Sequence, residues 1–247
     1  MKRRLFYGVA AAILALAASP AVAADINFKF PISQSGFESL TKEAGAALGY
    51  RNLVPAEPLG ITGFDIGFEV SAMKIDENSA YWSSAFGSDA PAYLAVPKIR
   101  ARKGLPLGID VGAMYSYVPD SNVKLFGFEL SKAILEGGVA SPAVGVRATY
   151  TKMTGVDDLG LQTYGVDASV SKGFLFITPY AGAGLLWINS EAKGNLKTIS
   201  PNLSDVSTTV LRYFGGVKIT PLPLFSVTAE AEYAEQPVYS FKVAFTF

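Results

Sequence analysis

The sequence predicts an all-β protein, a closed antiparallel transmembrane β-barrel of about ten strands with a short N-terminal helix. Two observations predict this fold. From about residue 62 onward, large apolar residues alternate with small or polar ones in segments of about ten residues, the period and length of a membrane-crossing strand. Nearly all charges in these segments share one parity, so each strand has an apolar face for lipid and a polar face for a lumen.

The composition limits the chemistry that the chain can perform. Its 247 residues include no histidine and no cysteine. These absences exclude a Ser–His triad, a histidine-based metal site, a thiol nucleophile and a disulfide. Basic and acidic residues balance at 21 each, so no charge surplus favours a nucleic-acid partner. We expect no cofactor, no metal and no catalytic residue.

The N-terminus has the pattern of a secretory signal peptide. Basic residues occupy positions 2–4, an apolar run covers 5–18, and Ala21 and Ala23 form an Ala-x-Ala cleavage site. We expect cleavage after Ala23. The alternative, a retained membrane anchor, fits less well because the run is shorter than the ~20 residues that a spanning helix needs. The chain then divides into a signal peptide (1–23), an N-terminal segment (24–61) and a barrel (62–247).

The N-terminal segment is expected to contain one amphipathic helix at 37–48. Apolar residues recur there at helical spacing, a capping-box pattern begins at Ser35, and Gly49 supplies a C-terminal stop. Two positions for this helix stay open. It either plugs the lumen or lies beneath the barrel, on the side where the first strand begins.

Ten strands follow, and their even number returns the C-terminus to the side on which the first strand begins. We therefore expect both ends of the mature chain on that side, together with the shorter connections. The strands are expected at 62–75, 93–103, 109–118, 122–133, 143–153, 161–171, 175–189, 208–220, 224–233 and 238–247.

The polar faces carry acidic and basic residues in alternation from strand to strand. In a narrow lumen unpaired charges would be costly, so we expect cross-strand ion pairs. Two interpretations stay open: a polar, conducting lumen, or a salt-bridged interior that fills itself. The residues of this lumen network are Asp65, Glu69, Lys98, Arg100, Arg102, Asp110, Glu129, Arg147, Asp167, Arg212, Lys218, Glu230, Glu232 and Lys242.

Lys242 is expected to lie between carboxylates. Pairing of the last two strands would bring it close to Glu230 and Glu232, and closure onto the first strand would bring Asp65 and Glu69 beside it. Lys218 would approach the same two glutamates from the other side.

Glycines share the inward parity of the charges. Glycine weakens a strand unless a bend or a close neighbour requires it. One interpretation is barrel curvature, and the other is that the helix packs against a glycine-lined wall. The inward glycines are Gly67, Gly112, Gly127, Gly145, Gly165, Gly182, Gly184 and Gly216.

Two carboxylate pairs could in principle serve acid–base catalysis. Glu230 and Glu232 have lysines on both adjacent strands, which favours ion pairing. Asp157 and Asp158 lie in a turn, which favours a solvated surface. The sequence therefore predicts no enzyme.

The last strand ends in alternating apolar residues, Tyr239, Phe241, Val243, Phe245 and Phe247. It resembles the C-terminal signature of bacterial outer-membrane proteins, which the barrel-assembly machinery reads. The resemblance implies residence in the outer membrane of a Gram-negative cell, lipid as a partner, and a periplasmic location for the C-terminus and the shorter connections.

The stretches PAEPLG at 55–60, GFDIGFE at 63–69, VPDSN at 118–122 and TPYAG at 178–182 resemble a family of small, uncharacterised bacterial outer-membrane barrels. A fainter similarity is to FadL-type transporters, whose N-terminal segment plugs the lumen. We expect a porin-like but non-enzymatic membrane protein, either structural or a narrow passage for small solutes. The alternative is a barrel that binds or transports a hydrophobic ligand, a lipid or fatty acid, with the helix and the glycine-lined lumen.

Overall fold

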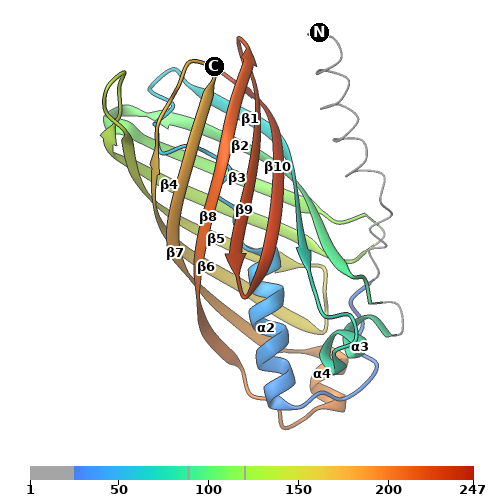
Figure 1. Ribbon diagram of the computed structural model, residues 1–247. Helices are drawn as coiled ribbons and strands as arrows, with labels where there is room; N and C mark the ends of the chain where they lie inside the picture. The colour runs from blue at the N-terminus through green and yellow to red at the C-terminus, as the bar shows by residue number, and fades with distance from the viewer. Residues whose placement is uncertain (1–24, 88–89, 120) are drawn as a thin grey trace.

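The computed structural model describes residues 25–87, 90–119 and 121–247 (Figure 1). The proposed signal peptide lies outside the described residues. The described chain forms a closed antiparallel barrel in which each strand pairs with its sequence neighbours and β1 pairs with β10. The strands are β1 (Phe64–Lys74), β2 (Tyr93–Leu105), β3 (Ile109–Tyr117), β4 (Lys124–Glu136), β5 (Ala143–Thr154), β6 (Leu159–Ser171), β7 (Ile177–Ala192), β8 (Val206–Leu222), β9 (Phe225–Ala234) and β10 (Gln236–Thr246).

The predicted barrel of ten antiparallel strands is confirmed, with strand ends within three residues of the expected ones. The longest connections contain short helices that the alternation pattern did not reveal. They are α3 (Ala80–Phe86) between β1 and β2, and α4 (Gly194–Ile199) between β7 and β8. A 3-10 turn, η2 (Pro106–Gly108), joins β2 to β3. None of the described helices has the length and apolar character needed to cross a membrane.

The wall of the barrel is apolar outside and polar inside. Large apolar side chains stay exposed on the outer face of every strand, among them Phe68, Phe128 and Tyr213, each more than half exposed. A water-soluble protein rarely exposes a continuous apolar surface of this extent. Alternate residues of the same strands are buried and carry the charges. This is the arrangement of a barrel with lipid outside and a polar lumen.

The ends of the barrel differ. Connections of two to six residues join β2 to β3, β4 to β5, β6 to β7 and β8 to β9 at one end, which we call the turn end. Phe247 lies there and exchanges backbone hydrogen bonds with Phe64, so the first and last barrel residues meet. The opposite end, the loop end, carries α3 and α4, as Figure 1 shows.

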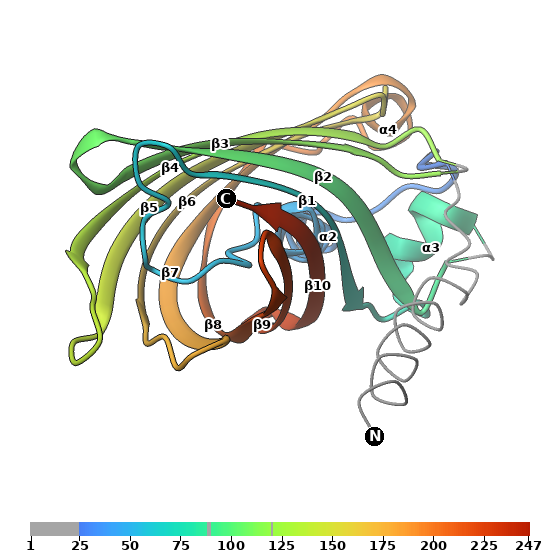
Figure 2. The same ribbon diagram turned by 90° about the horizontal axis from the view of Figure 1, so that it is seen from above.

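The helix α2 (Gln34–Leu48) lies against the inner faces of β7 and β8, and its later turns are buried within the ring of strands (Figure 2). It begins earlier than expected, because Ser33 and not Ser35 is the N-cap: the Ser33 hydroxyl accepts a hydrogen bond from the Gly36 amide at 3.1 Å. Gly49 ends the helix as expected, with its amide bonded to the Gly45 carbonyl.

The expectation that both ends of the mature chain lie on one side is wrong. Residues 26–34 bond to connections of the loop end, α2 descends from there, and residues 49–63 continue through the lumen to the start of β1. The even strand count places only the barrel's own ends on one side, and the preceding segment crosses the barrel once more. We call residues 25–63 the threaded segment.

A substitution at Gly45 on α2 tests how closely the helix packs against β7. A Cβ atom at this position would lie 2.4 Å from Ile188 Cγ2 on β7. Gly45→Val should therefore destabilise the protein by about 1–3 kcal/mol through overpacking, measured as a lower denaturant midpoint with an unchanged slope. Gly215→Val is the matched control, because a Cβ there meets nothing closer than 3.8 Å. Equal midpoints for both variants would show that α2 does not pack against β7.

Candidate functional site

The lumen contains a chain of ion pairs that runs along the wall from β2 to β8. Arg102 bonds to Asp110 at 3.0 Å and lies 2.5 Å from Glu129. Glu129 also faces Arg147 at 3.5 Å, and Arg147 binds Asp167 at 2.6 Å. Arg212 on β8 completes the chain by contacting Asp167 at 2.6 Å. All these side chains are at most 5% exposed, so each charge depends on its partners rather than on solvent.

A second group of pairs lies at the seam where β1 closes the barrel. The register sets Glu69 opposite Lys242 on β10 and opposite Lys98 on β2. Glu69 forms ion pairs with Lys98 and Arg100, both at 3.4 Å, while Lys242 binds Asp65 at 2.9 Å. The seam is thus joined by buried charges as well as by backbone hydrogen bonds.

The expected pairing of Glu230 and Glu232 with lysines is wrong. Both Lys218 and Lys242 lie opposite Thr228, two residues nearer the turn end than Glu230. Neither glutamate forms an ion pair with these lysines. Glu232 pairs instead with Arg51 of the threaded segment. Glu230 accepts hydrogen bonds from the Tyr180 hydroxyl at 2.8 Å and the Leu53 amide at 2.9 Å.

In mid-lumen the threaded segment lies beside four basic side chains of the barrel wall. We call Lys98, Arg100, Arg147 and Arg212 the cation arc, which comes from β2, β5 and β8. These side chains donate to the consecutive carbonyls of residues 49–52. Arg212 binds the Tyr50 carbonyl at 2.9 Å, Arg100 the Asn52 carbonyl at 2.8 Å, Arg147 the Arg51 carbonyl at 2.6 Å, and Lys98 the Gly49 carbonyl at 3.5 Å.

These carbonyls follow the C-terminus of α2, where the helix dipole is negative and the last carbonyls lack partners within the helix. Arg51 satisfies some of them, because its guanidinium donates to the carbonyls of Ala46 and Ala47 while it pairs with Glu232. The Tyr50 ring lies 4.4 Å from the Arg100 guanidinium, within cation–π range. Arg51, Lys98 and Arg212 therefore surround the C-terminal end of α2 and neutralise its partial negative charge.

Sequence reasoning missed Tyr50, Arg51 and Glu43 as functional residues. Arg51 is fully buried although it lies outside the strands, and no periodicity marks it. The only signal was a polar Arg51–Asn52 pair that begins two residues after the helix stop at Gly49.

The expectation that α2 packs against the inward strand glycines is wrong, because the nearest atoms to these glycines do not belong to α2. A Cβ at Gly127 would lie 2.8 Å from the Tyr50 ring, and one at Gly145 3.3 Å from the Ala56 carbonyl, so these two positions make room for the extended part of the threaded segment. Elsewhere the nearest atoms belong to the wall itself, such as Tyr180 at Gly216. The helix instead brings its own glycines, Gly45 and Gly49, to β7.

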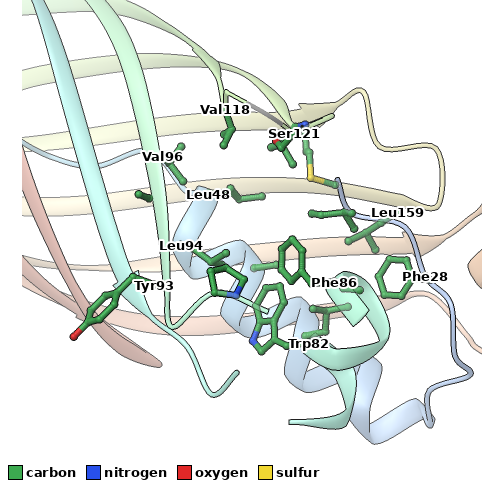
Figure 3. Close-up of a pocket in the computed structure, with 18 residues that line it drawn as sticks. Phe28, Leu48, Trp82, Phe86, Tyr93, Leu94, Val96, Val118, Ser121 and Leu159 are labelled. Atoms are coloured by element: carbon green, nitrogen blue, oxygen red, sulfur yellow. Dashed lines mark hydrogen bonds between the residues drawn. The ribbon is translucent and has the colours of Figure 1, made fainter. Parts of the chain in front are cut away.

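The loop end of the lumen is apolar. Side chains from residues 26–28, α2, α3 and the strand ends line a small cavity of about 60 Å³. Figure 3 shows Phe28, Trp82, Phe86 and Leu159 gathered on one side of it. Phe28, Leu48, Trp82, Phe86 and Leu159 line it. An apolar cavity of this kind remains dry and accepts small apolar groups.

Glu43 joins α2 to α3 beside this cavity. Its buried carboxylate accepts hydrogen bonds from the Trp82 indole at 2.6 Å and from the Tyr81 hydroxyl at 3.0 Å. Burial raises the pKa of Tyr81 above its usual value, so this hydroxyl keeps the proton that it donates. Glu43 thereby ties the helix in the loop between β1 and β2 to the threaded segment.

The polar groups of the lumen and of the loop end bind the threaded segment. Asp158 of the β5–β6 turn accepts from the backbone amides of Phe28 and Asn195, so it is an anchor and not the solvated turn residue that the sequence predicted. Within the described parts of the chain, no group of three or more acidic residues is placed to hold a metal ion.

Lys242 tests the seam. Lys242→Ala leaves Asp65 buried without its cation, a change that costs about 3–5 kcal/mol for a buried pair. We expect a lower denaturant midpoint with retained membrane insertion. Lys193→Ala is the control, because the Lys193–Glu191 pair is half-exposed and should contribute at most about 1 kcal/mol. Unchanged stability of Lys242→Ala would show that the pair does not support closure.

No protein-family model matches the sequence, and no curated protein matches it. Solved structures similar to the chain include several bacterial outer-membrane barrels. The N-terminal β-barrel domain of OprF from Pseudomonas aeruginosa gives 13% identity and a TM-score of 0.37, covering 74% of this chain and 97% of that one. Ail of Yersinia pestis gives 15% identity and 0.34, covering 75% and 99%. Omp33 of Acinetobacter baumannii gives 9% and 0.34, covering 76% and 100%. By its own apolar wall and charged lumen, the chain is an integral transmembrane β-barrel.

Proposed function

We propose that this protein is a non-enzymatic barrel of the bacterial outer membrane whose lumen is closed by its own threaded segment. The observation that carries the proposal is the contact of the cation arc with the carbonyls of residues 49–52. Protein backbone occupies the lumen at the level of the cation arc, and we infer that it blocks the passage of solutes there. The protein is then structural in this state, and a narrow passage for small solutes requires that the segment move.

A non-enzymatic role agrees with the engagement of the lumen carboxylates. Glu69, Glu129 and Asp167 each face two cations. Glu230 and Glu232 bind the threaded segment instead of forming a pair that could share a proton. A general acid or base must reach a substrate, and these groups are enclosed between wall and segment.

Assembly by the barrel-assembly machinery agrees with the last strand. Tyr239, Phe245 and Phe247 are each at least 58% exposed on the lipid-facing side. They are accessible to a partner during insertion and to lipid afterwards. The same strand places Lys242 in the lumen, so recognition and closure use opposite faces of β10.

Planar-bilayer recordings test the closed lumen. The wild-type protein should give no steady conductance, whereas Arg51→Ala, which releases the segment from Glu232, should give channel openings. Thr41 and Ser190 are hydrogen-bonded across α2 and β7, and the chain has no other cysteine to interfere. Adding Thr41→Cys and Ser190→Cys to the Arg51→Ala variant should abolish the openings under oxidation and restore them under reduction. Steady currents through the wild-type protein, or openings of the cysteine-bearing Arg51→Ala variant that persist under oxidation, would overturn the proposal.

A second candidate is the binding of a hydrophobic ligand, and the apolar cavity at the loop end favours it. Its size suits a few carbons, such as the end of an acyl chain. The site differs from the glycine-lined lumen that the sequence suggested, since that wall is filled by Tyr50, Tyr180 and other side chains.

Trp82 in the cavity wall reports on this candidate. In a Trp187→Phe background, which leaves Trp82 as the only tryptophan, a bromine-tagged fatty acid that enters the cavity should quench its fluorescence in a saturable way. Ala44→Leu adds carbons to the cavity wall and should weaken quenching at least tenfold, whereas Ala231→Leu on the lipid-facing side should not. Equal quenching in both variants would exclude the cavity as the binding site.

A further inference from the structure

The threaded segment traverses the barrel from one mouth to the other. At the loop end, the Ile26 amide bonds to Asn122 at 3.0 Å and the Ile32 amide to Ser200 at 3.1 Å. In mid-lumen, residues 49–52 meet the cation arc. At the turn end, the Ala56 amide bonds to Ser171 and the Leu59 amide to Asp110, both at 3.1 Å.

The first part of the segment is built into the loop end. Residues 26–34 hydrogen-bond to α3 and to the β3–β4, β5–β6 and β7–β8 connections. The contacts join Asn27 to Ala85, Lys29 to Ser84, Phe28 to Asp158 and Asn195, and Gln34 to Ser204. Such specific bonds to separate connections indicate a fixed cap rather than a passing strand. We call residues 25–34 with α3 and α4 the cap.

The two barrel ends are distinguishable by their connections. Transmembrane barrels of bacteria have short turns on the periplasmic side and longer loops outside. The turn end, with Phe247, then faces the periplasm, and the cap faces outward. Asp25 lies on the cap side and is exposed.

We propose that the barrel carries the N-terminal part of its own chain through its lumen and displays residues 25–34 on the cell surface as part of the cap. The ligand of the lumen is thus the protein's own threaded segment, which the cation arc binds through backbone carbonyls. Recognition through carbonyls depends little on the side chains that pass. Only the direction of display rests on the proposed outer-membrane placement; the threading does not.

Single-cysteine labelling tests this proposal on the full-length chain, which has no native cysteine. Asp25→Cys, Asp205→Cys on the β7–β8 connection and Val139→Cys on the β4–β5 turn are all at exposed positions. A membrane-impermeant maleimide applied to intact cells should label Asp25→Cys as fully as Asp205→Cys. Val139→Cys should be labelled only after the outer membrane is permeabilised.

An Asp25→Cys variant that is protected together with Val139→Cys would overturn the display. Equal labelling of Asp205→Cys and Val139→Cys would instead count against the membrane placement. Threading is then decided on purified protein: a short bis-maleimide should join Asp25→Cys to Asn122→Cys in the folded barrel, and the absence of this crosslink would overturn it.

Discussion

The structure depends on how a narrow lumen satisfies charges that water cannot reach. A buried cation without partners is severely destabilising, and an ion pair repays the loss of hydration only when further hydrogen bonds complete its geometry. Here the arginines of the wall divide their donors between carboxylates and the carbonyls of the threaded segment. The segment accepts hydrogen bonds from the arginines of the wall, and these arginines satisfy carbonyls that follow the helix end. Barrel and segment therefore stabilise each other.

This mutual dependence explains why the acidic and basic residues are not simply paired across neighbouring strands. The wall network supplies seven acidic and seven basic residues, and Arg51 adds one more cation from the segment. Glu232 is taken by Arg51, and Glu230 by Tyr180 and the Leu53 amide. Lys242 is thereby left to Asp65 at the seam. The acidic and basic side chains of the lumen are therefore matched only when the threaded segment is in place.

The strands and their inward faces could be predicted because the side-chain period of a strand is two, so parity alone decides which residues face the lumen. What alternation cannot supply is the level of a residue along the barrel axis. Lys218 and Lys242 were expected at the level of Glu230, but the registers of β8 and β10 with β9 set both opposite Thr228. The depth of α2 in the lumen and the role of Arg51 could not be predicted either, because both arise from contacts between residues far apart in the chain. The Ser33 cap shows the usual local ambiguity, since two nearby serines compete for the helix start.

A linear chain that passes through a closed ring is a mechanical link, comparable to the axle of a rotaxane. The seam between Phe64 and Phe247 lies at the mouth where the segment joins β1, so one end of the axle is covalently part of the ring. Release is then possible only by withdrawal toward the cap, which must first break the bonds of residues 26–34. A force that pulls residue 25 away from the barrel would act first on the hydrogen bonds of residues 26–34 and then on those of the cation arc. A force toward the barrel would press α2 toward the covalent link between the segment and β1. The barrel is therefore a directional holder, in which resistance to pulling depends on the side from which the chain is pulled.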